Sequence, residues 1–334
     1  MLKIFETNDF CRHVGMTVMK MLRAGVNTWN LYEPLQLKRR VHYSLRGRHS
    51  FANRSHDSDS LLVVLAGYKE ALWDEVFGRI ARFLPDDIDV CVVTSGKRVV
   101  RLESLCAERG WSYLCTRRNH VCLAQNLAIH CHPKARWIYK IDEDIFLTAG
   151  FFEKLKEIYR KAECEQRFEI GFVAPLIPVN GYGHVRVLEK TGLVDEWEAR
   201  FGRLRYTEGF YRNTSILSNP DAARFMWGIG NPKLRDIDAL NERFAADVTY
   251  SVCPIRFSIG AILFNRFTWA DWGMFPVVMG TGMGEDEEHV CRYCLMHSKA
   301  MVVAENALVG HLAYGPQTGA MMGEFSNGRI PHVS

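Results

Sequence analysis

Residues 136–147 read Arg136-Trp137-Ile138-Tyr139-Lys140-Ile141-Asp142-Glu143-Asp144-Ile145-Phe146-Leu147. A run rich in β-branched and aromatic residues ends in three carboxylates, and the chain then becomes apolar again. Such a run is typical of a strand buried in a sheet, and it places the carboxylates at the carboxyl end of that strand. Because open α/β sheets bind ligands just beyond this end, the acidic triplet is the first candidate for a functional site.

The triplet Asp142-Glu143-Asp144 contains no basic residue, so its carboxylates repel one another unless a counter-charge is present. A divalent cation supplies that charge, since the hard oxygens of Asp142 and Asp144 suit Mg²⁺ or Mn²⁺ that also binds phosphate oxygens. The alternative is a solvated turn between a strand and a loop, which is the common explanation of an isolated Asp-x-Asp triplet.

Apolar runs alternate with helical stripes on the N-terminal side of this triplet. We predict buried strands at 61–67, 88–93 and 111–115, with helices at 72–83 and 102–109 between them. Alternation of strands and helices favours an α/β fold whose central sheet is mostly parallel and flanked by helices.

Length and composition are those of an ordinary globular protein. The 334 residues suffice for one large α/β domain or two small ones, and 48% of them are hydrophobic. The net charge of +4 is too small to indicate nucleic acid as a partner. The ten cysteines follow no disulfide framework and are expected to be reduced. Residues 1–10 lack a signal-peptide core, and the longest apolar run, Leu61–Ala66, is too short for a bilayer, so we expect a cytoplasmic protein.

The acidic triplet and its flanks resemble the nucleotide-sugar-dependent glycosyltransferases of the GT-A fold, in particular inverting, family 2-like enzymes with an Asp-x-Asp motif. That family places the motif at the end of a central strand, followed by a short apolar segment and a helix, as 142–144, 145–147 and 150–155 do here. The resemblance covers about residues 60–315. It implies a Rossmann-like sheet, a nucleoside-diphosphate sugar as donor, a UDP-sugar first, and Mn²⁺ or Mg²⁺ as cofactor.

The resemblance also divides the chain. Residues 59–334 are expected to form the GT-A domain, with a nucleotide-binding half at 59–147 and an acceptor half at 148–334. Residues 1–58 form a basic N-terminal extension that includes a helical face, and its polar end at 47–59 is expected to be a loop. The face consists of Phe10, Val14, Val18, Met21 and Leu22. The basic extension is explained either by a peripheral contact with the inner face of a membrane or, more commonly, by a docked helix with a solvated basic loop.

By the same resemblance, several residues are candidate donor contacts. They lie at the ends of the first strands, in the small-residue helix before the motif and in the motif itself: Gly67, Tyr68, Ser95, Asn126, Lys140, Asp142 and Glu143. The family often has an acidic residue near the end of the second strand to hold uracil. Ser95-Gly96-Lys97-Arg98 stands there instead, which leaves the base of the donor open.

The catalytic end of the resemblance lies far downstream. Glu285-Asp286, after a glycine-rich turn, match the Glu-Asp pair that inverting enzymes place under the acceptor hydroxyl. A carboxylate within hydrogen-bond reach of that hydroxyl acts as general base, so we assign Asp286 as base and Glu285 as a residue that orients the acceptor. His311, after an apolar segment and a glycine, matches the histidine that returns to the cation, which gives Asp142, Asp144 and His311 as the metal ligands. The neighbouring Glu287 is explained by the start of a helix alone.

The expected reaction is transfer of a sugar, with inversion, to a hydroxyl of a glycan or a lipid-linked acceptor, in surface polysaccharide synthesis. One alternative keeps the fold but retains the anomeric configuration. A sugar nucleotidyltransferase is a second alternative, for which Gly67-Tyr68-Lys69-Glu70 is a poor phosphate loop. A third is a non-catalytic protein that binds nucleotide sugars.

Overall fold

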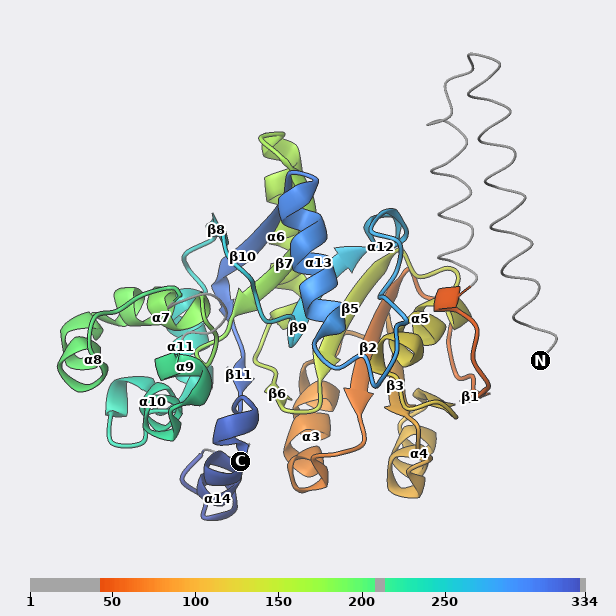
Figure 1. The fold of residues 1–334 in the computed structure, drawn as a ribbon, viewed down its shortest axis with the longest axis horizontal. Coiled ribbons are helices and arrows are strands. Elements are labelled where there is room, and N and C mark those ends of the chain that lie inside the picture. The colour runs from red at the N-terminus through yellow and green to blue at the C-terminus, as the bar shows by residue number, and fades with distance from the viewer. Residues whose placement is uncertain (1–42, 208–213, 331–334) are drawn as a thin grey trace.

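The computed structural model describes residues 43–207 and 214–330. The helical face predicted at Phe10 to Leu22 lies outside the described residues. Within them, one large sheet has the strand order β1-β4-β3-β2-β5-β9-β7-β10-β8 (Figure 1). Its strands are β1 (His49–Ala52), β2 (Ser60–Ala66), β3 (Ile88–Ser95), β4 (Ser112–Thr116), β5 (Trp137–Asp142), β7 (Glu169–Leu176), β8 (Tyr250–Val252), β9 (Ala261–Asn265) and β10 (Lys299–Leu308).

Six strands of this sheet point the same way. The pairs β4–β3, β3–β2, β2–β5 and β7–β10 are parallel, and β9 is antiparallel to both β5 and β7. β1 and β8 are antiparallel strands at the two edges. The predicted α/β class with a mostly parallel central sheet is therefore confirmed, and the three strands predicted before the acidic triplet exist to within about two residues.

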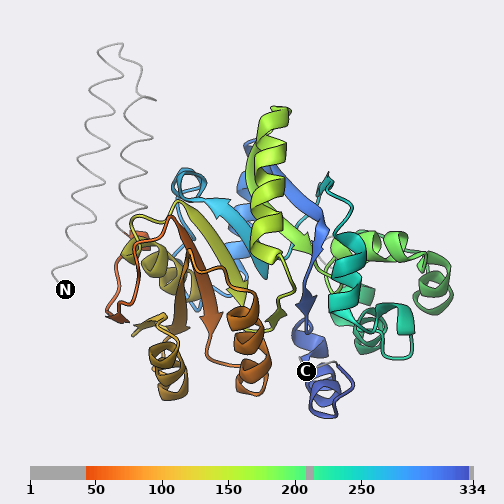
Figure 2. The same cartoon turned by 180° about the vertical axis from the view of Figure 1, so that it is seen from behind.

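Helices cover both faces of the sheet. α5 and α13 lie in front of it in Figure 1, and α3 and α6 lie in front in the reverse view of Figure 2. The helices are α3 (Trp73–Phe83), α4 (Val100–Glu108), α5 (Val121–Cys131), α6 (Phe151–Glu165), α7 (Gly183–Thr191), α8 (Val194–Phe201), α9 (Thr214–Ser218), α10 (Pro220–Met226), α11 (Ile237–Phe244), α12 (Arg266–Asp271), α13 (Glu285–Met296) and α14 (Thr318–Ser326). α7 to α11 gather beside the β10–β8 edge, where the sequence showed no clear period (Figure 1).

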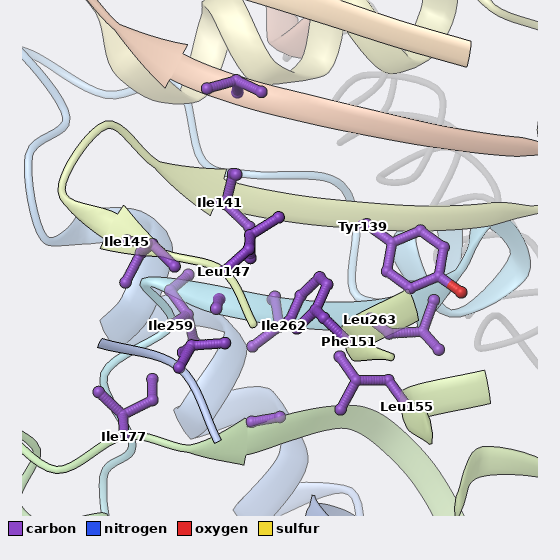
Figure 3. Packing of buried hydrophobic residues seen from close by; sticks show 14 of the residues in the cluster. Tyr139, Ile141, Ile145, Leu147, Phe151, Leu155, Ile177, Ile259, Ile262 and Leu263 are labelled. Carbon is purple, nitrogen blue, oxygen red and sulfur yellow. The ribbon is translucent and has the colours of Figure 1, made fainter. Parts of the chain in front are cut away.

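The core explains why the central strands read as unbroken apolar runs. Strands covered on both faces bury every side chain, and β2 and β3 are buried almost throughout. Under the acidic triplet, Tyr139 and Ile141 of β5 pack with Phe151 and Leu155 of α6 (Figure 3). The hydroxyl of Tyr139 donates to the carbonyl of Phe152 at 2.9 Å, which satisfies its polar end inside this core.

One prediction about the N-terminal region was wrong. The stretch 47–59 was expected to be a loop, but His49–Ala52 forms the edge strand β1, in register with Thr116 to Tyr113 of β4. Polar, half-exposed residues are typical of an edge strand with one paired side, which is why the stretch looked like a loop. The boundary at residue 58 stays a prediction, although the sheet extends N-terminal to it. Among the described residues no helix is long and apolar enough to span a bilayer.

Candidate functional site

The acidic triplet ends β5 at the carboxyl edge of the sheet, as predicted. β5 stops at Asp142, and the chain turns through Glu143 and Asp144 into the short strand β6 (Ile145–Phe146). β6 pairs antiparallel with β11 (Gly310–His311), with His311 opposite Ile145. This small second sheet, visible near the centre of Figure 1, is what brings the end of the chain back to the acidic turn.

Asp144 lies between two cationic groups. Its Oδ2 forms an ion pair with the ammonium of Lys69 and lies 3.4 Å from Nε2 of His311. The carboxylate is buried, with 3% of its side chain exposed. Burial alone would raise the pKa of Asp144, but the charges and hydrogen bonds of His311 and Lys69 outweigh it and hold that pKa below its usual range. Asp144 is therefore ionised at neutral pH.

The backbone fixes the orientation of the His311 ring. Nδ1 lies 2.9 Å from the carbonyl oxygen of Val179, so this nitrogen carries the hydrogen and donates it. Nε2 is left facing Asp144 and needs a proton or a cation between itself and the carboxylate. Burial lowers the pKa of His311, but Asp144 and the hydrogen bond to Val179 together outweigh it, so that pKa lies above its usual value. A ring whose other nitrogen donates to a backbone carbonyl is the usual arrangement of a metal-binding histidine.

Glu143 is used differently from the expected donor contact. Its carboxylate accepts hydrogen bonds from the backbone nitrogens of Gly67 and Tyr68, each at 2.8 Å, and from Nε1 of Trp73 at 2.7 Å. Both oxygens are thereby occupied, and the side chain is buried. Glu143 holds the loop between β2 and α3, and this loop carries Lys69 to Asp144.

Replacing Glu143 by glutamine is expected to lower the free energy of unfolding by about 3 kcal/mol. The hydrogen bonds to the charged carboxylate are lost, and the new NH2 group of glutamine faces an N–H donor in place of an acceptor oxygen. Urea denaturation measures the change. Glu70→Gln is the matched control, since its side chain is 64% exposed and pairs with Arg101 at the surface. The control should stay within about 0.5 kcal/mol of the wild type. Equal losses in the two variants would contradict the role given to Glu143.

Asp142 is paired by Lys140, two residues earlier on the same face of β5. The ammonium of Lys140 lies 2.7 Å from Oδ1 of Asp142 and donates to the carbonyl of Ile259 at 2.9 Å. Oδ1 is buried and accepts no well-aligned hydrogen bond. Burial raises the pKa of Asp142, and the charges of Asp144 and Asp286 add to this while Lys140 opposes it. The repulsion within the triplet is thus relieved by Lys140, which was expected to contact the donor, and by Lys69, which was not predicted at this site.

Asp286, expected as the base, lies at the same edge of the sheet. It is the second residue of α13, its side chain is buried, and its Oδ2 accepts a hydrogen bond from Nε2 of Gln125 at 3.1 Å. Its charge acts on both Lys140 and Asp142, which places it beside the acidic turn. Glu285 is exposed. The structure therefore gathers Asp142, Asp144, Asp286 and His311 from segments far apart in the chain.

Residues that sequence reasoning missed complete this edge. Glu287, assigned to the helix start alone, forms an ion pair with Arg256, and its charge acts on Lys140. Burial raises the pKa of Glu287, with Arg256 opposing. The side chain of Tyr314 is hydrogen-bonded to Ser258 and is subject to the charges of Glu287 and Asp144. The signal for Glu287 was its place next to the Glu-Asp pair, whereas Arg256 had none in the sequence.

Three of the residues expected to contact the donor lie together in the structure. Gly67 and Tyr68 follow β2, Ser95 ends β3, and the hydroxyl of Tyr68 donates to the carbonyl of Ser95 at 3.1 Å. Asn119, which was not predicted, accepts from both Tyr68 and Ser95 at 3.2 Å. The ammonium of Lys97 lies 4.3 Å from the centre of the Tyr68 ring, which is 56% exposed. An exposed aromatic ring at a strand end offers a stacking face for a base.

The donor contact expected at Asn126 was wrong. Asn126 is fully buried in α5, and its amide is saturated by bonds to the backbone of Ser44 and Phe275 and to Nε1 of Trp269. It has no donor or acceptor left for a ligand. The preceding residue of the helix, Gln125, is the one directed at Asp286, because consecutive helix positions are rotated by about 100°.

Two surface hollows lie away from these residues. One of about 480 Å³ is lined by the beginnings of β7 and β10, at Glu169 and Lys299. The other, of about 450 Å³, is lined by Asp59 before β2 and by Asp86 to Asp89 at the beginning of β3. Both are at the amino ends of strands, whereas ligands of open α/β sheets bind at the carboxyl ends. Neither hollow contains the acidic turn. The candidate site is therefore identified by its charged side chains and not by a surface hollow.

The contacts of the acidic turn suit a divalent cation only in part. Within residues 43–207 and 214–330, no group of three or more His, Cys, Asp or Glu side chains is arranged to hold a metal ion. The expected set of Asp142, Asp144 and His311 is thus not gathered as three ligands, because Asp142 turns to Lys140. Asp144 and His311 do fit as a pair, with Nε2 directed at the carboxylate. Two protein ligands suffice for Mg²⁺ or Mn²⁺ when phosphate oxygens and water supply the rest.

No family model and no curated protein matches this chain. Among solved structures, a match is GalNAc-T7 with UDP, GalNAc and Mn²⁺, at 10% identity and a TM-score of 0.44, covering 78% of this chain and 45% of that one. Another is the mannosyltransferase PcManGT from Pyrobaculum calidifontis in complex with GDP-Man and Mn²⁺, at 15% identity and a TM-score of 0.43, covering 85% of this chain and 66% of that one. The chain spans less than half of the first and about two thirds of the second. Likeness at this level establishes no function.

Proposed function

We propose that this chain is a GT-A-type glycosyltransferase that moves a sugar from a nucleoside-diphosphate donor to a hydroxyl of an acceptor, with inversion. One observation carries the proposal. The β6–β11 pairing sets His311 against Asp144 at the end of β5, and α13 brings Asp286 to the same edge. An anion-neutralising centre and a buried carboxylate base are the two parts that direct displacement at a sugar carbon requires.

The residues have separate tasks in this proposal. Tyr68, Ser95 and Asn119 hold the base and ribose of the donor at the ends of β2 and β3. Asp144 and His311 hold Mn²⁺ or Mg²⁺, which when bound neutralises charge on the diphosphate. Asp286 accepts the proton of the acceptor hydroxyl, and Gln125 holds the carboxylate in place. Glu287 and Arg256 line the acceptor side. A cytoplasmic enzyme that acts on a glycan or lipid-linked acceptor for surface polysaccharide is the setting we propose.

A metal-independent transferase is the second candidate, and the ion pairs favour it. Lys140 and Lys69 already neutralise Asp142 and Asp144. A lysine that leaves its carboxylate for a phosphate supplies positive charge to the leaving group without any cation. The two candidates differ in what removal of metal does.

The test is release of nucleotide from UDP-sugars and GDP-sugars, with a mixed panel of glycan and lipid-linked acceptors. The measurement is made with Mn²⁺ and after treatment with a chelator. Release that needs Mn²⁺ supports the first candidate, and release that survives chelation supports the second. Absence of release and of nucleotide binding with every donor would overturn both. The anomeric configuration of the product, read by NMR, tests inversion.

Replacing Lys69 by methionine is expected to change two quantities in opposite directions. Without its competitor at Asp144, Mn²⁺ should bind roughly tenfold more tightly, as titrated by electron paramagnetic resonance. Turnover should fall about a hundredfold, because a charge aimed at the departing phosphate is lost. Lys97→Met is the control, since Lys97 contacts the Tyr68 ring and no carboxylate of the triplet. A Lys69→Met variant with unchanged Mn²⁺ affinity would show that the two cations do not compete.

A further inference from the structure

A short loop in front of α13 exposes apolar side chains. In residues 278–283, here called the methionine loop, Val278 is 40% exposed, Met279 93% and Met283 70%. The loop runs past α5 and leads into α13 (Figure 1). Large apolar side chains grouped on a surface, unlike scattered ones, mark an interaction site.

The inner side of the methionine loop is fixed to the protein. Nε2 of His120 lies 3.2 Å from the backbone nitrogen of Val278, and the backbone nitrogen of Val121 donates to the carbonyl of Thr281 at 2.8 Å. Gly282 has a φ of +72°, and a Cβ there would lie 2.4 Å from the His120 ring. These contacts determine which side chains point outward. Val278, Met279 and Met283 are exposed because the backbone is held, so ordering them on a partner costs little further backbone entropy.

One arginine, Arg118, contacts the methionine loop, and Arg117 and Arg48 adjoin Arg118. Arg118 donates to the carbonyl of Val278, and the backbone nitrogen of Arg117 donates to the carbonyl of Arg48 at 2.9 Å. All three arginine side chains are exposed. Four acidic residues, 285–288, follow the loop. Asp286 is buried, Glu287 and Glu288 form ion pairs with arginines, and Glu285 is exposed. Protruding apolar side chains bordered by guanidinium groups match the interface of an anionic membrane, where apolar groups enter the acyl boundary and cations meet phosphate.

The described part of the chain begins beside the helix that the methionine loop contacts. Ser44 is held by Asn126 of α5, and a Cβ on Gly47 would touch Leu123 of that helix, so the described chain begins against α5. Residues 1–42 contain seven Lys and Arg and three Asp and Glu, an excess of 7 − 3 = 4. In the whole chain, the 42 Lys and Arg exceed the 38 Asp and Glu by 42 − 38 = 4. The net positive charge of the chain therefore equals that of residues 1–42. By its charge alone, a segment of this composition adds attraction to an anionic surface.

We propose that the methionine loop, with Arg48, Arg117 and Arg118, is the surface by which this protein docks on an anionic lipid bilayer. Met279 and Met283 enter the headgroup region, and the arginines bind lipid phosphates. The loop ends directly before α13, whose second residue is Asp286. Docking therefore sets the candidate base next to the lipid surface. The proposal goes beyond sugar transfer and does not depend on it.

The test uses the full chain and vesicles of phosphatidylcholine with about one third phosphatidylglycerol, compared with phosphatidylcholine alone. Wild type is expected to sediment with the anionic vesicles. Met279→Ser with Met283→Ser should weaken binding roughly tenfold, because apolar burial is lost. Arg48→Gln with Arg117→Gln should weaken it to a similar extent, about tenfold, at low salt, and this difference should shrink at high salt.

The matched control is Leu295→Ser with Met296→Ser, at the other end of α13. These side chains are 52% and 75% exposed, and the control should bind vesicles as wild type does. Binding by the methionine variant equal to wild type would overturn the proposal and would assign attachment to residues 1–42. Absence of wild-type binding, or an equal loss in the control, would overturn it as well. Thermal melting checks the fold of each variant, and nucleotide binding, measured separately, tests sugar transfer and leaves this result unchanged.

Discussion

Replacing Asp286 by asparagine is expected to reduce turnover about 10²–10⁴-fold, the usual contribution of a positioned general base. Asparagine keeps the size of the side chain, and its one oxygen can still accept the hydrogen bond from the backbone nitrogen of Glu287, whereas its amide group replaces the oxygen that accepts from Gln125. What it loses is the ability to take a proton. Binding of the donor should stay within about twofold of wild type, because the proposed task of Asp286 is to act on the acceptor hydroxyl.

Glu287 provides the discriminating comparison for this prediction. It is the neighbouring carboxylate at the same edge, burial raises its pKa, and it is paired with Arg256. Glu287→Gln should weaken acceptor binding, seen as a raised KM, with a smaller effect on kcat than Asp286→Asn. Turnover near wild type in Asp286→Asn, together with loss of kcat in Glu287→Gln, would transfer the role of base to Glu287.

Asp144→Asn is expected to abolish the Mn²⁺-dependent part of nucleotide binding, with an affinity loss of at least roughly 100-fold, since even residues behind a metal ligand cost 10–100-fold. Asp144 alone among the triplet contacts His311, and it is buried between that ring and Lys69. Calorimetric titration of UDP and GDP, with and without Mn²⁺, measures the loss. Turnover should fall with it.

The internal comparison is Asp142→Asn, because the two aspartates are equivalent in an Asp-x-Asp pattern but not in the structure. Asp142 is turned to Lys140, and 35% of its side chain is exposed. We expect its substitution to reduce Mn²⁺-dependent binding by about tenfold, less than Asp144→Asn does. Equal losses would mean that both carboxylates ligate the cation once the donor is bound. A larger loss at Asp142 would contradict the assignment of Asp144 and His311 as the central pair.

The sequence by itself determined the central strands and the edge of the sheet at which the candidate site residues lie. The strands β2, β3 and β5 are covered on both faces, so each is an unbroken apolar run that can be recognised from the local sequence alone. The carboxylates after β5 are placed at the carboxyl edge by chain direction alone. The edge strand β1 could not be predicted from the sequence, because its residues are polar and pack on one side only.

Only the tertiary structure decided what each side chain at that edge does. Lys69 reaches Asp144 and Glu143 holds Gly67 because β2 lies beside β5 in the sheet. The hydrophobic periodicity of a single segment does not specify this strand order. His311 meets Asp144 through two residues of β11, too short a strand to predict. In α5, Gln125 and not Asn126 is directed at Asp286, a difference of one position that rotates a side chain by about 100°. Local patterns specify elements, whereas contacts between distant residues depend on the order, register and rotation with which those elements pack.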